Sequence, residues 1–118
     1  MEQEYIKCDI VMYNNKIHTI MDTIGLNNYE LSCVNHQVHQ LELSGVPITT
    51  EILEKNGWRK EQENDFNDSY HIFLENEYEK YSAFKVVHNH VVWLRDVRSV
   101  SDLQHLLFGL GINHEMEV

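Results

Sequence analysis

The stretch that decides how we interpret the fold is Ser99-Val-Ser-Asp-Leu-Gln-His-Leu-Leu-Phe-Gly-Leu-Gly111. Ser99, followed three residues later by an aspartate, is typical of a capping box, and Gly111 suits the left-handed residue that ends a helix. The leucines recur at the three- and four-residue spacing of a core-facing helix, namely Leu103, Leu106, Leu107 and Leu110. The stretch therefore predicts a C-terminal helix packed on a sheet.

Upstream of this helix, the chain begins with apolar residues that alternate with polar ones, as in half-buried strands. Strands are predicted over 5–13, 16–24, 29–33 and 38–43. The pair Asn14-Asn15 is a typical hairpin turn between the first two strands. Four short strands in succession predict an antiparallel meander, built as a bent sheet or a small barrel.

A short helix is predicted next, because Thr49 suits an N-cap and Gly57 suits the residue after a helix. The polar, acidic stretch 61–69 then predicts a loop. The strands that follow are predicted over 70–74, 78–87 and 91–97. Together they predict a second antiparallel sheet of about three strands.

This order of elements predicts an α+β fold, with an N-terminal antiparallel meander, a short helix, a second antiparallel sheet and the closing helix. A chain of 118 residues fits a single domain over 1–118, which can divide into sub-units at 1–46 and 47–118. Cys8 and Cys33 stand in apolar runs. They predict two buried thiols, and a disulfide between them is the alternative.

The net charge of the chain limits the classes of molecule that it can bind. With 19 Asp and Glu against 9 Lys and Arg, the formal net charge is −10, so the chain repels phosphate backbones and non-specific nucleic-acid binding is not expected. The opening residues are acidic where a signal peptide is basic, and no apolar run approaches the roughly 18 residues of a membrane span. These observations predict a cytoplasmic protein without a membrane partner. No glycine-rich phosphate motif occurs, and no cofactor is expected.

Two motifs can be compared with known proteins. One is Pro47-Ile-Thr-Thr-Glu-Ile-Leu-Glu-Lys-Asn-Gly-Trp58, and the other is the C-terminal helix with its tail His114-Glu-Met-Glu-Val118. They resemble the "P-I-T-x-E-I-L-x-K-x-G-[FW]" and "V-x-x-L-Q-x-L-x-F-x-L-x-G" segments of small, largely uncharacterised phage and mobile-element proteins of gut bacteria. The chain departs from that pattern at Ser101 and His105, where the family has His and Asn. The matched positions are caps, core leucines and a terminal glycine. The resemblance therefore implies a shared fold and a bacterial host cell, but no catalytic residue.

Aromatic and arginine side chains in the second half of the chain predict a ligand-binding face. Basic residues are scarce in this chain, and a phosphate-bearing ligand would need them beside rings that can stack on a base. The candidate residues are Tyr70, Tyr78, Tyr81, Trp93, Arg95 and Arg98. An ordinary core is the alternative interpretation of these aromatic residues.

Histidines offer a weaker, metal-binding alternative. The candidate ligands are His36, His39, His88 and His90. Residues two apart on a strand project to the same face, so His88 and His90 could chelate one ion jointly. Zinc needs three or four ligands that converge on one point, and the sequence does not show which residue would complete the set. Surface or hydrogen-bonded histidines are the alternative.

These observations favour a non-enzymatic accessory protein of a phage or mobile element that acts by binding, with counter-defence as its role. The partner is either a host protein, which the chain would inhibit, or a small signalling nucleotide, which it would sequester. A homo-oligomer is a further expectation by analogy with other viral sequestering proteins. The competing hypothesis is a metal-dependent enzyme or a metal-binding protein built on the histidine pairs.

Overall fold

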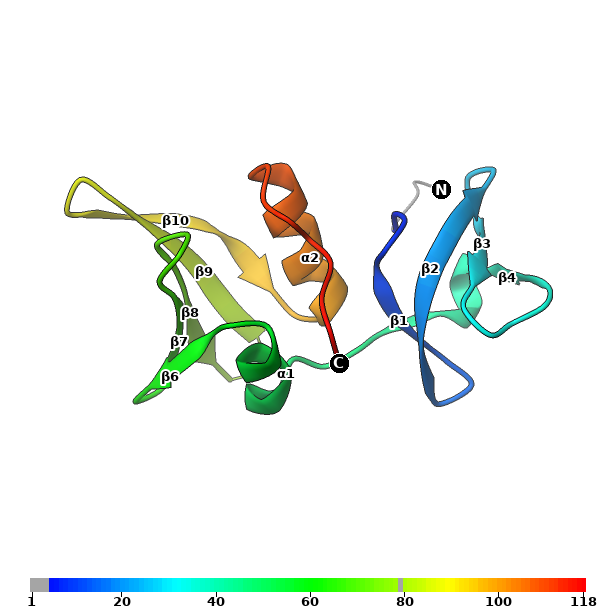
Figure 1. Cartoon of the computed structure of the whole chain (residues 1–118), viewed down its shortest axis with the longest axis horizontal. Helices are drawn as coiled ribbons and strands as arrows, with labels where there is room; N and C mark the ends of the chain where they lie inside the picture. The colour runs from blue at the N-terminus through cyan, green and yellow to red at the C-terminus, as the bar shows by residue number, and fades with distance from the viewer. Residues whose placement is uncertain (1–4, 79) are drawn as a thin grey trace. The chain divides into compact units, whose positions relative to one another are not determined.

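A computed structural model describes residues 5–78 and 80–118 of the chain (Figure 1). The chain divides into two compact units, and each is described here by itself. The first unit comprises Met1–Pro47 and Ser99–Glu115, and the second comprises Ile48–Arg98 and Met116–Val118. Within the described residues the fold is mixed, with two antiparallel sheets of five strands each and two α-helices. The α+β class is therefore confirmed, although both sheets have more strands than predicted.

The first sheet is a meander whose fifth strand returns to the first, in the order β4-β3-β2-β1-β5. Its elements are β1 Ile10–Tyr13, β2 Lys16–Ile24, β3 Asn28–Leu31, β4 Gln37–His39, the 3-10 helix η1 Gln40–Glu42 and β5 Ser44–Gly45. Asn14 and Asn15 form the predicted β1–β2 turn with φ of 50° and 61°, left-handed values that asparagine tolerates well. The predicted first strand is too long, because Cys8 turns the chain at φ 79° before β1 begins.

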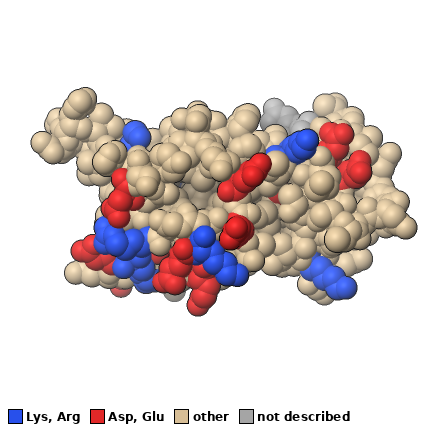
Figure 2. All heavy atoms as spheres, viewed as in Figure 1, with Lys and Arg blue, Asp and Glu red and all other residues tan. Residues whose placement is uncertain are grey.

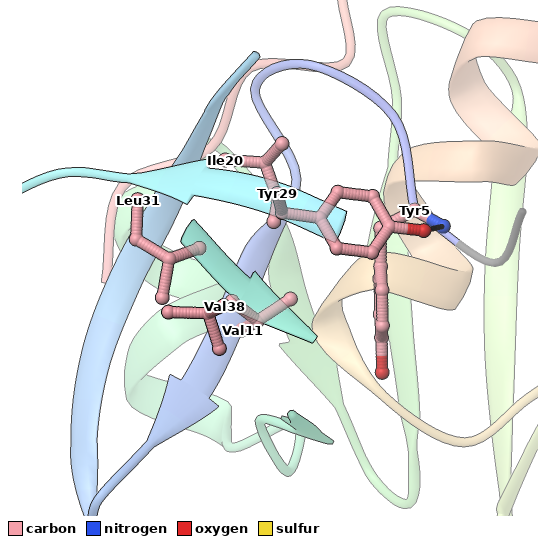
Figure 3. Close-up of a cluster of buried hydrophobic side chains, with 6 residues drawn as sticks. All are labelled: Tyr5, Val11, Ile20, Tyr29, Leu31 and Val38. Carbon is pink, nitrogen blue, oxygen red and sulfur yellow. Dashed lines mark hydrogen bonds between the residues drawn. The ribbon is translucent and has the colours of Figure 1, made fainter. Parts of the chain in front are cut away.

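The core of this sheet is a cluster of buried side chains from most of its strands (Figure 3). Its members are Tyr5, Val11, Ile20, Tyr29, Leu31 and Val38. Tyr29 is fully buried, and its hydroxyl donates to Gln40 Oε1 at 2.7 Å. The same hydroxyl accepts the Tyr5 backbone N–H at 3.3 Å. The phenol is therefore buried without losing its hydrogen bonds, as a buried tyrosine requires.

The C-terminal helix α2, Val100–Gly109, belongs to the first unit rather than to residues 47–118. Its Ser99 N-cap accepts the Asp102 N–H at 3.2 Å, as the sequence predicts. Gly111, at φ 74°, ends the helix; its N–H donates to Phe108 and the next N–H donates to Leu107, the Schellman pattern. Three of the four predicted leucines are buried, but Leu110 is 38% exposed because the helix has already ended there.

β5 fixes where this helix begins. The Val100 N–H donates to the Val46 carbonyl at 2.9 Å. A Cβ on Gly45 would lie 2.8 Å from Ser99 Cβ, which real Cβ atoms essentially never show. Glycine is therefore required where the β5 backbone meets the start of α2. This close approach attaches the last helix to the first sheet, a long-range contact that helix periodicity cannot reveal.

The second unit begins with α1, Thr50–Lys55, and continues as an antiparallel sheet in the order β10-β9-β8-β7-β6. The strands are β6 Arg59–Glu61, β7 Asn64–Asn67, β8 Ile72–Glu77, β9 Lys80–Val87 and β10 His90–Val97. Thr49 caps α1 by accepting the Ile52 N–H at 3.2 Å, and Gly57 follows the helix at φ 85°. Both predicted helix signals are confirmed.

The loop predicted over 61–69 is wrong, because most of it forms the β6–β7 hairpin. One face of the second sheet is buried, and its apolar members include Ile72, Leu74, Ala83 and Val97. Asp65, 2% exposed, continues this buried face onto β7, since it pairs with Leu74. Burial raises the pKa of Asp65. Neither helix in the described part of the chain is long and apolar enough to cross a membrane.

Candidate binding surface on the second sheet

The second sheet carries a row of aromatic rings on the face opposite its buried one. Cross-strand partners lie on the same face, and the register pairs Phe66 with Phe73, Phe73 with Phe84, and Phe84 with Trp93. The rings of Phe66 and Phe73 lie 5.5 Å apart, and those of Phe73 and Phe84 stack at 5.0 Å. The three phenylalanines are half-buried and Trp93 is 57% exposed. We call these four residues the aromatic row.

Arg59 closes the row at the β6 edge. Its guanidinium lies 5.0 Å from the centre of the Phe66 ring, within cation–π range. It also donates to Asp68 at 3.1 and 3.2 Å and to Glu61 at 2.5 Å. These hydrogen bonds, first from Asp68 and then from Glu61, raise the pKa of Arg59. The charge at this end of the row is therefore compensated by two acids.

At the other end, the β9–β10 hairpin extends past Ile72, the first residue of β8, as Figure 1 shows. His88 and Asn89 form its turn with φ of 48° and 67°. Beyond Lys85 the hairpin is apolar on both faces, with exposed valines and the exposed tryptophan. Their exposed fractions are Val86 40%, Val87 37%, Val91 57%, Val92 47% and Trp93 57%. Large apolar side chains exposed together on one element indicate an interaction site.

Charge is unevenly divided between this hairpin and the rest of the chain. Residues 80–98 hold four of the nine Lys and Arg but one of the 19 acids, Asp96. Lys80 donates to Asp96 at 2.8 Å and Ser82 lies 3.4 Å from it, and the Lys80 hydrogen bond lowers the pKa of the Asp96 carboxyl. In Figure 2 the end of the hairpin is almost entirely tan, whereas blue and red side chains gather near β6. The exposed apolar surface therefore lies in a segment whose bases outnumber its acids, although the chain as a whole is acidic.

The six predicted ligand-binding residues do not converge on one site. Tyr78 and Arg98 line a hollow of about 320 Å³ with Lys80 and Glu77. Trp93 lies in the aromatic row, apart from that hollow. The other three are Tyr70, Tyr81 and Arg95, and none of them lines the hollow either. Only two of the six residues therefore line the hollow, and the acid Glu77 lines it with them.

A β-bulge explains why Trp93 and Arg95 separate. Strand periodicity would put both on the same face, since they are two residues apart. The register shifts between them, so that Trp93 pairs with Phe84 whereas Arg95 pairs with Ala83, its neighbour in sequence. The extra residue, Leu94, moves Arg95 to the opposite side of the sheet. Tyr81 lies on that side as well, half-buried, and burial raises its pKa.

The four candidate metal ligands are also dispersed. His88 lies in a turn rather than on a strand, so it does not share a strand face with His90. His39 Nδ1 accepts the Leu41 N–H at 3.1 Å as the cap of η1, and His36 Nδ1 lies 3.0 Å from the Gln37 carbonyl. Over 5–78 and 80–118, no three His, Cys, Asp or Glu side chains form a group that could hold a metal ion.

The cysteines differ from the sequence expectation. Both thiols are free, Cys8 is half-buried and Cys33 is exposed, so the prediction of two buried thiols is wrong. Cys33 lies at φ 62° just after β3, where the chain leaves the sheet. It borders an open hollow of about 690 Å³ with Tyr13 and His36. Tyr13 packs edge-on against His36, with the ring centres 6.4 Å apart.

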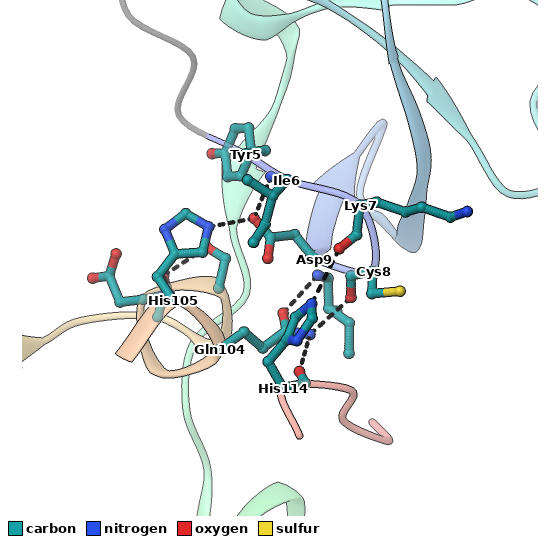
Figure 4. A network of polar contacts seen from close by, with 12 residues as sticks. Tyr5, Ile6, Lys7, Cys8, Asp9, Gln104, His105 and His114 are labelled. Carbon is teal, nitrogen blue, oxygen red and sulfur yellow. Dashed lines mark hydrogen bonds and ion pairs between the residues drawn. The ribbon is translucent and has the colours of Figure 1, made fainter. Parts of the chain in front are cut away.

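A polar cluster in the first unit has a structural function (Figure 4). Gln104, fully buried on α2, accepts the Ile10 N–H at 2.8 Å and donates to the Cys8 and His114 carbonyls at 2.8 and 2.9 Å. Asp9, also fully buried, contacts His105 Nε2 at 2.5 Å and accepts the Ile6 N–H at 2.9 Å. These hydrogen bonds and the Asp9–His105 contact connect residues 8–10 to α2.

The sequence prediction did not include Phe66 and Phe73 of the aromatic row. Phe66 was assigned to a loop, and Phe73 was not among the candidates. Neither strand alternates apolar with polar residues, because Phe66 is the single apolar residue of Asn64–Asn67 and Ile72-Phe-Leu is continuously apolar, so the sequence carries no local signal for this face. Comparison with protein-family models, with curated proteins and with solved structures finds no match to this chain. The candidate surface therefore rests on its own geometry.

Proposed function

We propose that this chain is a non-enzymatic accessory protein of the phage or mobile-element type that its two motifs resemble, and that it acts by binding a host protein. The observation that carries the proposal is the aromatic row, continued by the exposed valines of the β9–β10 hairpin. Exposed aromatic side chains are typical of residues that dominate binding energy. Counter-defence, by inhibition of the bound host protein, is the role that we propose for this contact.

The charge around this surface defines the partner further. Whereas the chain as a whole carries −10, residues 80–98 contain a single acid against four bases. A partner that meets the hairpin would therefore present an apolar surface with an acidic rim. Complementary charge mainly sets association rate and specificity, so the contact would be sensitive to salt.

Affinity capture from host lysate with two matched variants tests the proposal. In V86S/W93S, two exposed apolar residues of the surface are made polar, and in the control L26S/L41S, two residues that are 66% and 76% exposed in the first unit are changed in the same way. We expect one host protein to be recovered by the wild type and the control and to be lost by V86S/W93S. Equal recovery by all three proteins would contradict the proposal.

A second candidate function is sequestration of a small signalling nucleotide. The hollow is lined by Tyr78, Lys80 and Arg98, so that a nucleotide could stack its base on the ring and place its phosphate near the two cations. The acid Glu77 also lines this hollow. A nucleotide that binds there must raise the melting temperature, so thermal-shift screening against cyclic di- and trinucleotides is a direct test. R98A should lose any shift that Y70A, a matched exposed position outside the hollow, retains. No stabilisation by any nucleotide would leave protein binding as the function.

A further inference from the structure

The second sheet has one long, unguarded edge. Among the described strands, β10 is paired only with β9, and its eight residues leave one side without a neighbouring strand. The other sheet edges are short: β6 and β4 have three residues each and β5 has two. All three residues of β6 are charged, which is a common protection against edge-to-edge pairing. Residues 90–94 of β10 contain no Lys, Arg, Asp, Glu or Pro.

The hairpin shows which backbone groups of β10 point outward. In a two-residue turn, the flanking pair Val87 and His90 is the hydrogen-bonded pair, and bonded and non-bonded pairs then alternate along the strands. Val86 and Val91 therefore form a non-bonded pair whose N–H and C=O groups point away from each other. The hydrogen bond of the Val86 N–H is consistent with this assignment, because the N–H points away from β10 and donates to the His71 carbonyl at 2.9 Å, on the side of β8. Val91 and, two residues on, Trp93 thus direct their backbone groups out of the edge.

We propose that two copies of this chain associate through antiparallel pairing of β10 with β10, centred on Val92. In this register Val91 faces Trp93 of the second copy, and Trp93 faces its Val91. Both positions direct a donor and an acceptor outward, so the two pairs form four backbone hydrogen bonds. The same pairing places Val91 and Trp93 of both copies on one face and the two Val92 side chains together on the other. An edge that is complementary to itself in this way produces a closed, two-fold dimer.

The bulge at Leu94 limits the pairing to the apolar part of the edge. Beyond it, the extra residue breaks the alternation, so Arg95 and Asp96 do not continue the register. The five residues from His90 to Leu94 are therefore the ones that pair. The aromatic row of each copy then continues across the two-fold axis, because Trp93 of one copy meets Val91 of the other. The dimer joins two binding faces into one and does not depend on a host partner.

The distribution of charge along the chain also favours pairing at β10. Two chains that each carry −10 repel one another, so they can approach only where acids are scarce. The acid nearest in sequence to the pairing residues is Asp96, which accepts a hydrogen bond from Lys80 at 2.8 Å. Arg95 of one copy lies about 20 Å from Arg95 of the other in this register, by the rise of about 3.4 Å per residue, well beyond the screening length. Because salt screens the repulsion between the two negatively charged chains, added salt should lower the dimer Kd.

Sedimentation velocity over a concentration series tests the proposal. V91P removes an outward N–H without removing a bond of the β9–β10 ladder, and V91T keeps that N–H with a side chain of similar shape. We expect the wild type and V91T to reach twice the 14.0 kDa monomer mass, and V91P to raise the dimer Kd at least about tenfold, since each dimer loses two backbone hydrogen bonds. A wild type that stays monomeric throughout, or a V91P variant that dimerises as tightly as wild type, would overturn the proposal.

Cysteine cross-linking provides a second measurement if V91P folds poorly. In a C8S/C33S background, V92C places two thiols opposite each other at a non-bonded position across the axis, where Cβ atoms lie about 4.5–5.5 Å apart. V86C is the control, because Val86 is exposed to a similar degree but lies on β9. We expect rapid disulfide-linked dimers from V92C alone. Equal cross-linking of both variants, or none by V92C, would show that the edge does not pair with itself and is open to an extended segment of another protein.

Discussion

The two units of this protein differ in which side chains they bury, because the first buries polar groups whereas the second leaves aromatic rings partly exposed. The first unit buries several polar side chains, and Gln104 on α2 and the Tyr29 hydroxyl on β3 are hydrogen-bonded there. The second sheet places its aromatic row on a half-exposed face and ends in an apolar hairpin. Buried, fully bonded polar groups give a fold its rigidity, whereas exposed aromatic side chains contribute little to folding. The difference is consistent with the proposal that the second unit carries the binding surface.

The most severe test of this comparison is Gln104→Ala in the first unit. The substitution leaves one backbone N–H and two carbonyls without their side-chain partner, and we expect the free energy of unfolding to fall by about 4 kcal/mol. Denaturant unfolding measures this change. The control is Gln37→Ala, an exposed position on β4, which should change stability little. A loss no larger than that of the control would mean that the buried network does not stabilise the unit.

Neighbouring residues of β8 sharpen the comparison within the second unit. Leu74 is fully buried and Phe73 is half-buried on the opposite face. We expect Leu74→Ala to cost about 3 kcal/mol through the cavity that it leaves. Phe73→Ala should cost about 1.5 kcal/mol, mainly through its ring contacts with Phe66 and Phe84. Denaturant unfolding of both variants gives the difference. Equal losses would show that the aromatic row is a core rather than a binding face.

Asp65 makes the stability of the second unit depend on pH. Burial raises the pKa of this carboxyl in the folded state, so the folded protein holds its proton to higher pH than the unfolded chain does. Stability should therefore fall as the pH rises from about 3.9, the unfolded value, through the raised folded value. Asp65→Asn removes this dependence and should stabilise the protein at neutral pH but not at pH 3. Unfolding measured across pH 3–8 tests it, and parallel curves for the two proteins would refute it.

The smallest effect is expected from Arg59→Gln at the β6 edge. Its ion pairs with Glu61 and Asp68 are exposed to solvent, where such pairs contribute little. We expect a shift in melting temperature near the limit of detection, together with unchanged dimerisation. A clear loss of stability would instead show that the cation over Phe66 holds the aromatic row in place.

The sequence reasoning succeeded where the signal is carried by a few adjacent residues. The caps Thr49 and Ser99, the glycines after both helices and the Asn14-Asn15 turn all occur as predicted. It failed over 61–69, because β7 turns Asp65 and Asn67 toward the buried face. A strand whose buried residues are polar cannot be recognised from alternating hydrophobicity.

The candidate surface was predicted only in part. Trp93 was predicted to lie on a ligand-binding face. Its neighbours on β7 and β8 were not predicted, because strand register determines which residues lie side by side. Arg95 was predicted to share a binding face with Trp93, and the bulge at Leu94 puts the two on opposite sides of the sheet. Tyr78 and Arg98 do share a hollow, although the chain gives no local sign of it.

By itself, the sequence determined where helices and turns begin and end, since each of those signals is a hydrogen bond or a backbone angle within four or five residues. Only the tertiary structure decided that α2 joins the first sheet, through the close approach of Gly45 and Ser99 and the hydrogen bonds of Gln104. It also decided which face of the second sheet is buried and that β10 is left as its edge. Both depend on pairing between residues far apart in the chain, where burial and register rather than local preference set the free energy.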